Sequence, residues 1–145
     1  MVIRCLKFAV AYLMIGVVMG LIMGITRQFQ YAPVHAHINL LGWVSLAVIA
    51  LIYHAFPQAA QTRLARMHFR LHNIGLPIFM LSLFLFLDDQ AWARFGIPVG
   101  AMMTLVGLAL FVINLVRTVG VAPTAPALAA AGPRVVDAVQ QNEFR

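Results

Sequence analysis

Four long apolar stretches, separated by short polar segments, constrain most strongly what this chain can fold into. They cover residues of about 8–25, 34–56, 68–87 and 92–116, and the third reaches this length only with its polar start near His68. A helix needs about 20 residues to cross a hydrocarbon core of about 30 Å, so each stretch is long enough to span a membrane. None shows the sustained alternation of a strand. The sequence therefore predicts an all-α integral membrane protein with four transmembrane helices.

Composition and loop length refine this prediction. The chain is 63% hydrophobic and only 10% charged, whereas soluble domains have about 25% charged residues. These values exclude an ordinary soluble domain and a disordered chain. The connections at 26–33, 57–67 and 88–91 are short, which predicts an up-down bundle of antiparallel neighbours. We expect one transmembrane domain over residues 1–117 and a flexible cytoplasmic tail over 118–145.

The basic residues indicate how the chain is oriented. The net charge is +6, but the ten Lys and Arg residues are scattered between apolar blocks, so we expect lipid contacts and no nucleic-acid partner. With a cytoplasmic N-terminus, eight of the ten lie on the inner side, namely Arg4, Lys7, Arg63, Arg66, Arg70, Arg117, Arg134 and Arg145. Only Arg27 and Arg94 lie outside. The positive-inside rule therefore predicts that both termini are cytoplasmic. The first stretch lacks an A-x-A-like cleavage site after it, so we expect a retained helix and not a signal peptide.

Glycines at helical spacing predict close packing. Gly16, Gly20 and Gly24 form two overlapping GxxxG units on one face of the first helix, and such small residues let another helix approach closely. A looser series occurs in the fourth stretch, at Gly96, Gly100 and Gly107. The partner of the first series, inside the bundle or in another subunit, stays open.

Two histidines begin the second stretch, about one turn inside the outer face. His35 and His37 are two residues apart, so on an α-helix they point about 200° apart and cannot share one metal ion. They can serve two sites, because imidazole binds iron, copper or zinc. We expect Gly42 to leave room for a flat macrocycle on the His35 face. The His37 face continues with an apolar wall of Leu41, Val44, Val48 and Leu51. The alternative is a pair of interfacial histidines bonded to loop backbone.

A longer pattern contains this pair. It consists of His35-Ala36-His37-Ile38-Asn39-Leu40-Leu41-Gly42-Trp43, then Ile52-Tyr53 and Phe56-Pro57, then His68-Phe69. The pattern resembles the tenth and eleventh helices of the haem-copper oxidase catalytic subunit, most closely the cbb3-type and nitric-oxide-reductase-like branches. The similarity covers about residues 34–87, and the first and fourth stretches would be the flanking helices.

The resemblance implies a haem b protein of the bacterial-type cytoplasmic membrane. It makes His35 the axial ligand of a high-spin haem and His37 an axial ligand of a low-spin haem, with copper as a further possible cofactor. The family subunit has about twelve helices, and its copper ligands lie on helices that this chain lacks. Arg70 also replaces the Trp of the family's His-Phe-Trp. We therefore expect no complete oxygen-reducing site in one chain, and enzymatic activity stays open. A homo-oligomer, dimer or trimer, would share ligands between copies, and a respiratory complex or electron donor would be its partner.

Three further histidines, His54, His68 and His72, are expected near the inner face. His68 and His72 are four residues apart and share one helix face, which suits a metal ion with His54 as a third ligand. The alternative is a structural or lipid-facing role, because arginines surround them and disfavour a bound cation.

The histidines and the resemblance together leave two candidate functions. One is a b-type haem protein that transfers electrons or binds O2 or NO. The other is a haem-free protein that handles copper or another metal, or that serves as an assembly factor or scaffold of a respiratory complex.

Overall fold

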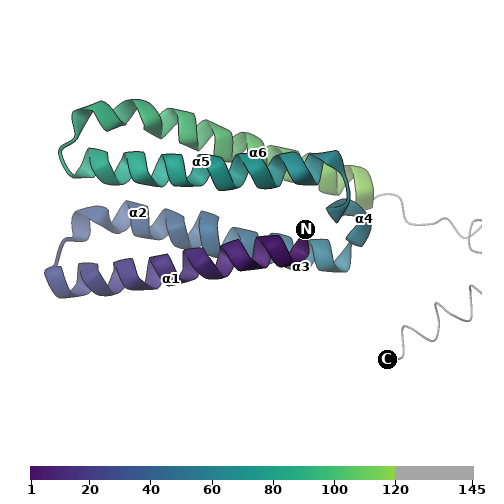
Figure 1. Cartoon of the computed structure of the whole chain (residues 1–145), viewed down its shortest axis with the longest axis horizontal. Coiled ribbons are helices and arrows are strands. Elements are labelled where there is room, and N and C mark those ends of the chain that lie inside the picture. Colours follow the sequence, from purple (N-terminus) through teal and green to yellow (C-terminus); the bar gives the residue numbers. More distant parts are fainter. Residues whose placement is uncertain (120–145) are drawn as a thin grey trace, which may run out of the picture.

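The computed structural model describes residues 1–119, and within them every regular element is a helix (Figure 1). The first helix is α1, Val2–Thr26. The second helix is a continuous series of four segments, η1 (Phe29–Tyr31), α2 (Ala32–His37), the π-helical η2 (Ile38–Val44) and α3 (Ser45–Ala55). The remaining elements are α4 (Pro57–Ala60), α5 (Arg63–Leu87), η3 (Ala91–Phe95) and α6 (Gly96–Val119). The predicted tail falls on residues outside those described, apart from its first two.

Four of these helices are long and apolar enough to cross a membrane, which confirms the predicted all-α membrane protein. They cover Val2–Thr26, Phe29–Ala55, Arg63–Leu87 and Ala91–Thr118. Helix α5 begins earlier than its apolar stretch because Thr62 caps it, and its hydroxyl accepts a hydrogen bond of 3.0 Å from the Ala65 amide.

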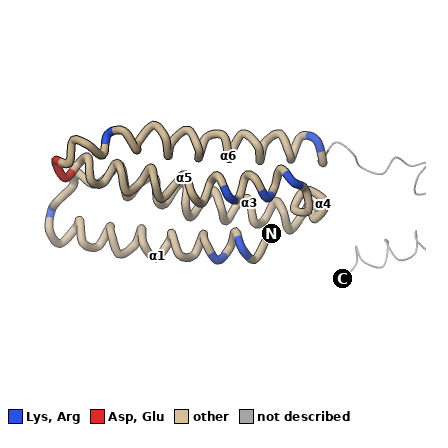
Figure 2. The backbone as a smooth tube through the Cα atoms, turned by 45° about the horizontal axis from the view of Figure 1, so that its top comes forward, with Lys and Arg blue, Asp and Glu red and all other residues tan. Residues whose placement is uncertain are grey.

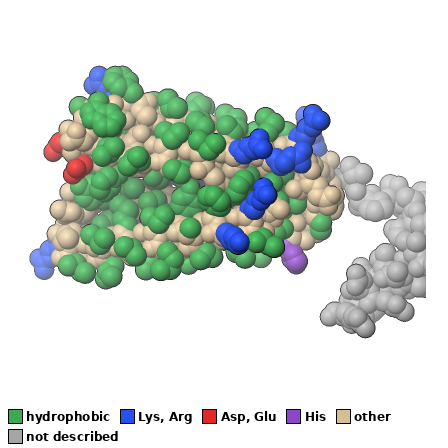
Figure 3. All heavy atoms as spheres, in the orientation of Figure 1, with side chains coloured by type: hydrophobic (Ala, Val, Ile, Leu, Met, Phe, Trp, Pro, Cys, Tyr) green, Lys and Arg blue, Asp and Glu red, His purple; other side chains and the backbone are tan. Residues whose placement is uncertain are grey.

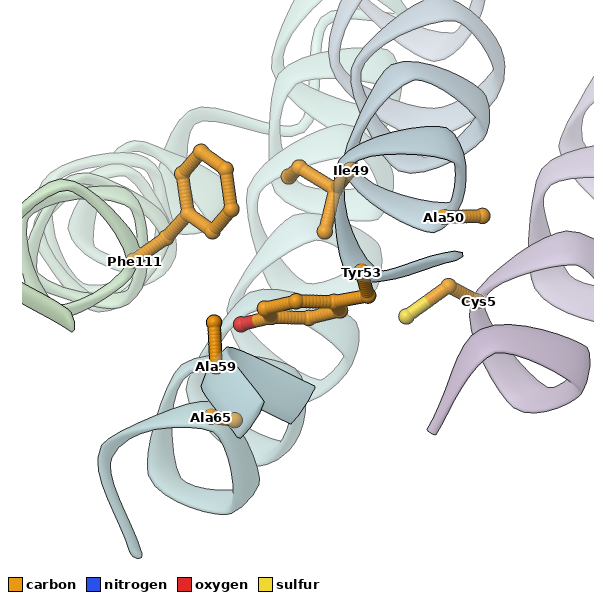
Figure 4. Packing of buried hydrophobic residues seen from close by; sticks show 7 residues of the cluster. All are labelled: Cys5, Ile49, Ala50, Tyr53, Ala59, Ala65 and Phe111. Carbon is orange, nitrogen blue, oxygen red and sulfur yellow. The ribbon is translucent and has the colours of Figure 1, made fainter. Parts of the chain in front are cut away.

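The helices form two antiparallel hairpins that lie side by side (Figure 1). Helix α1 packs on η2 and α3 of the second helix, and α5 packs along α6. The short α4 connects the hairpins near the N-terminus. Near α4 a core cluster joins all four helices, and in it the Tyr53 ring lies between Cys5 of α1 and Phe111 of α6 (Figure 4). A second cluster, centred on Tyr12, Leu46 and Leu76, fills the middle of the bundle.

Gly16 and Gly20 allow the close packing that the sequence predicts, whereas Gly24 does not take part, and the partner of α1 lies within the chain. A Cβ atom on Gly16 would come within 2.6 Å of the Asn39 side chain, and one on Gly20 within 2.8 Å of His35 Cε1. Gly24 has no such neighbour within 4 Å. On α6, a Cβ atom on Gly100 would collide with the backbone of Phe79. Both hairpins therefore depend on close helix contact.

Charge divides between the two ends of the bundle (Figure 2). Six of the eight described basic residues lie toward the α4 end, namely Arg4, Lys7, Arg63, Arg66, Arg70 and Arg117. Arg27, Arg94, Asp88 and Asp89 lie at the opposite end, here called the Asp88 end. There the hydroxyl of Tyr31 donates a hydrogen bond of 2.8 Å to Asp88 Oδ1, and its ring stacks on Phe84 at 4.7 Å. These contacts hold the two hairpins together at the Asp88 end.

Candidate functional site

The π-helical segment Ile38–Val44 follows directly after the histidine pair. In a π-helix the hydrogen bonds run from i to i+5, and such turns are rare and frequent at functional sites. The sequence predicts an ordinary helix here and misses this segment. One sequence signal could have indicated it: small or apolar residues recur every four positions, at Val34, Ile38, Gly42 and Leu46, and the structure buries all four. A regular α-helix would turn such a series by about 40° per step, whereas the wider π turn keeps it facing the bundle.

His35 and His37 point to different sides of the second helix, as the sequence predicts. The His35 ring lies against Gly20 of α1. The His37 ring makes an edge-to-face contact with Phe79 of α5, with 5.3 Å between ring centroids. Each histidine is partly buried. The two imidazoles therefore have separate surroundings and cannot ligate one metal ion together.

The His35 side is closed by α1. Asn39 Nδ2 donates a hydrogen bond of 2.9 Å to the His35 carbonyl and lies 3.4 Å from His35 Nε2, while His35 Nδ1 is buried without a partner. The expected space at Gly42 is also filled, because a Cβ atom there would lie 2.8 Å from Tyr12 Cβ. The prediction that Gly42 leaves room for a macrocycle is therefore wrong. This glycine lets α1 approach.

His37 is arranged as a metal-ligating histidine commonly is. Its Nδ1 lies 2.7 Å from the carbonyl oxygen of Pro33, and a carbonyl only accepts, so in the neutral tautomer that this contact selects Nδ1 carries the proton and Nε2 has the lone pair. A hydrogen bond from the other ring nitrogen to a backbone carbonyl is the usual support of such a ligand. The apolar wall predicted beside it is exposed, with Val44 at 44%, Val48 at 46% and Leu51 at 69%. These three side chains lie on the outside of the bundle and do not enclose a group within this chain.

His68 and His72 are fully buried, each 0% exposed. His68 Nδ1–H donates to Gly107 O on α6, and His72 Nε2–H donates to Leu41 O in the π-helical segment, both at 2.9 Å. The lipid-facing alternative is therefore wrong for this pair. Leu41 is the thirteenth residue of the 27-residue span Phe29–Ala55, so His72 lies near mid-depth and not near the inner face. The pair connects α5 to both of its neighbours.

The other nitrogen of each buried ring has no partner. His68 Nε2 and His72 Nδ1 are buried lone pairs, and the ring centroids are 5.5 Å apart. His54 is exposed at the end of α3 and so does not share their surroundings. Within residues 1–119, no three His, Cys, Asp or Glu side chains are grouped so that they could hold a metal ion. The structure thus brings together two of the three inner histidines.

A polar network near α4 was not predicted from the sequence. Asn114 is 1% exposed, its Nδ2 donates to Ala59 O at 2.8 Å, and its Oδ1 accepts from the Thr62 hydroxyl at 2.7 Å. This network holds the α4 connection against α6. Close by, Tyr53 is 0% exposed and its hydroxyl has no partner. An asparagine inside an apolar stretch is the signal that could have revealed the network.

Comparison with known proteins gives no relative: no family model, no curated protein and no solved structure matches the chain. The geometry of the histidines and the motif in residues 34–87 therefore carry the functional inference.

Proposed function

We propose that this chain is a multi-pass membrane haem b protein, resembling one module of a haem-copper oxidase, that transfers electrons or binds O2 or NO. The observation that carries the proposal is the His37 ring, whose Nδ1–H is bound to Pro33 O at 2.7 Å and whose Nε2 is left with a lone pair. Phe79 limits rotation of this ring by its edge-to-face contact. His37 Nε2 is thus the candidate axial ligand of a haem iron.

Haem and the protein chain would contribute different parts of this function. Haem supplies the redox and gas-binding chemistry when it is bound. The chain contributes the imidazole, its orientation by Pro33 and Phe79, and an apolar outer surface that includes Val44 and Val48. Exclusion of water and the identity of the axial ligand are the main means by which a protein tunes haem iron.

A second copy would complete the site. His35, the other ligand implied by the resemblance, is packed against the backbone of α1 at Gly20, so it does not fit a porphyrin in the chain as folded. His37 is only partly buried, and exposed apolar side chains follow it on the second helix, namely Leu40, Val44 and Val48. A closed dimer or trimer, in which His37 and a histidine of another copy would together hold the haem, would agree with both observations. An external electron donor of a respiratory chain would be the further partner.

Charge favours one orientation in the membrane. Six of the eight described basic residues lie toward the α4 end. By the positive-inside rule this end faces the cytoplasm, with the N-terminus inside, in a bacterial-type inner membrane. His37 then lies toward the outer face, where the resemblance implies haem.

One observation favours a second candidate, a haem-free protein that handles copper. His68 Nε2 and His72 Nδ1 are buried lone pairs on rings 5.5 Å apart. Imidazole is a suitable ligand for copper. A metal ion would provide these lone pairs with the partner that they lack.

The visible spectrum of the purified full chain, expressed with haem supply, separates the two. We expect a Soret band and α-bands that sharpen on reduction, and we expect both to be lost in His37→Ala. The matched control is His54→Ala, which changes an exposed histidine and should keep the spectrum. A chain without a Soret band that binds one equivalent of copper, lost in His68→Ala, would favour the second candidate. An unchanged Soret band in His37→Ala would refute His37 as the ligand.

A further inference from the structure

An apolar groove runs between α1 and α5 on one face of the bundle. One part has a volume of about 540 Å³, with walls that include Phe8 and Ala11 from α1 and Pro77 and Leu81 from α5. A second part of about 540 Å³ continues toward the Asp88 end. The two parts share three lining residues, Ile15, Met19 and Phe84. Along α1 the groove extends from Phe8 to Met23, about 22 Å at 1.5 Å per residue.

The groove becomes basic toward α4. On α5, Arg63, Arg66 and Arg70 lie at helical spacing on the same face as Pro77 and Leu81. On α1, Arg4 lies one turn before Phe8. Phe8 contacts Phe69 of α5 at 5.4 Å between centroids, which brings the two basic helix faces together. Figure 3 shows hydrophobic side chains lining the hollow between these helices and Lys and Arg side chains gathered toward its α4 end.

These cations have no acidic partner in the part of the chain that the structure describes. The carboxylates of residues 1–119, Asp88 and Asp89, lie at the other end of the bundle (Figure 2). Arg66 donates a hydrogen bond of 3.1 Å to the Gln61 carbonyl, which leaves its charge unpaired. Arg70 is seven residues after Arg63, about 10 Å further along the helix. Arg70 therefore lies deeper in the membrane than Arg63, which begins the helix. A guanidinium in this position needs an anion close to the edge of the hydrocarbon region.

We propose that this surface is a binding site for one anionic phospholipid. Its phosphate lies between Arg66 and Arg70 of α5 and Arg4 of α1, and one acyl chain lies in the groove beyond Phe8. Arginine pairs with phosphate in a bidentate manner, and the groove extends further than the depth of about 15 Å of one leaflet. Along each wall of the groove, a charged surface is followed by an apolar surface. A phospholipid has the same order, with a charged headgroup followed by apolar acyl chains. This inference is independent of haem binding.

Native mass spectrometry of the purified full chain tests the headgroup contact, with added phosphatidylglycerol or phosphatidylcholine as probes. We expect one retained phosphatidylglycerol per chain and much weaker retention of phosphatidylcholine. The double variant Arg66→Gln, Arg70→Gln should weaken phosphatidylglycerol binding by about 30-fold, from about 1 kcal/mol per basic residue. The matched control, Arg27→Gln with Arg94→Gln, removes equal charge at the Asp88 end and should keep the affinity. Equal loss in both double variants, or equal binding of the two lipids, would overturn the proposal.

A second pair of variants tests the groove itself. Ala11 is an exposed residue that lines the groove, and Ala109 is an exposed residue of α6 that lies apart from it. Ala11→Phe should fill the groove and reduce phosphatidylglycerol binding, whereas Ala109→Phe should not. If Ala11→Phe instead dissociates a dimer and leaves lipid binding intact, a second copy occupies the groove and the lipid proposal is wrong.

Discussion

His72 Nε2–H donates a hydrogen bond of 2.9 Å to the carbonyl oxygen of Leu41, and this bond connects the two helical hairpins near the middle of the bundle. The acceptor lies inside the π-helical segment Ile38–Val44. The same ring is within 5.5 Å of His68, which bonds α6 through Gly107. Helix α5 is therefore held on both sides by imidazole side chains.

Replacing His72 should destabilise the fold. In His72→Ala the Leu41 carbonyl loses its donor and a fully buried ring is removed. We expect a loss of about 1–3 kcal/mol from the hydrogen bond alone, measured by denaturant unfolding in detergent. His54→Ala is the matched control, because His54 is exposed, and it should change stability by less than about 0.5 kcal/mol. Equal stability of the two variants would show that the bond contributes nothing.

Two glycines of the GxxxG series, Gly20 and Gly24, should respond differently to a methyl group. A Cβ atom on Gly20 would lie 2.8 Å from His35 Cε1, whereas one on Gly24 would meet no neighbour within 4 Å. Gly20→Ala should therefore cost about 1–3 kcal/mol by overpacking. Gly24→Ala should be neutral or stabilising by up to about 1 kcal/mol, since alanine favours helix. Thermal unfolding of both variants in one detergent checks this, and the reverse order would contradict the packing of α1 on the second helix.

The fold could be predicted from the sequence because the membrane limits the choices. Apolar length, short loops and glycine spacing are local properties, and they predicted the four helices and the close packing of α1. The opposed directions of His35 and His37 also followed, since they depend only on helical geometry over two residues. The partner of the Gly16 and Gly20 face stayed open, because a small-residue stripe does not specify what packs on it.

The site was predicted less well because it depends on distant contacts. The π-helical segment changes which residues share a face after Ile38, so Val44 and Val48 are exposed and do not enclose a cofactor in one chain. Gly42 has two possible uses, space for a ligand or contact with a helix, and only the position of Tyr12 decides between them. The burial of His72 likewise depends on Leu41, which is 31 residues away. The spacing of residues in the sequence reveals neither the contact of Gly42 with Tyr12 nor the hydrogen bond of His72 to Leu41.

Orientation in the membrane can be read from two engineered cysteines. Gln61 lies near α4 and Gln90 at the Asp88 end, and both are exposed. The native Cys5 is 0% exposed and gives a low background. If the α4 end is cytoplasmic, a membrane-impermeant maleimide should label Gln90→Cys in intact cells and Gln61→Cys only after lysis. The opposite labelling pattern would reverse the proposed topology.

His35 should support packing more than cofactor binding. Its ring fills the space over Gly20, and its Nδ1 is buried without a partner. His35→Ala should therefore retain the Soret band that we expect of the wild type, while it lowers the unfolding temperature through the cavity that it leaves against α1. The measurement is an absorption spectrum and a thermal scan on the same sample, beside His37→Ala. If His35→Ala loses the band and keeps the unfolding temperature, His35 is the ligand and α1 must move to admit the haem.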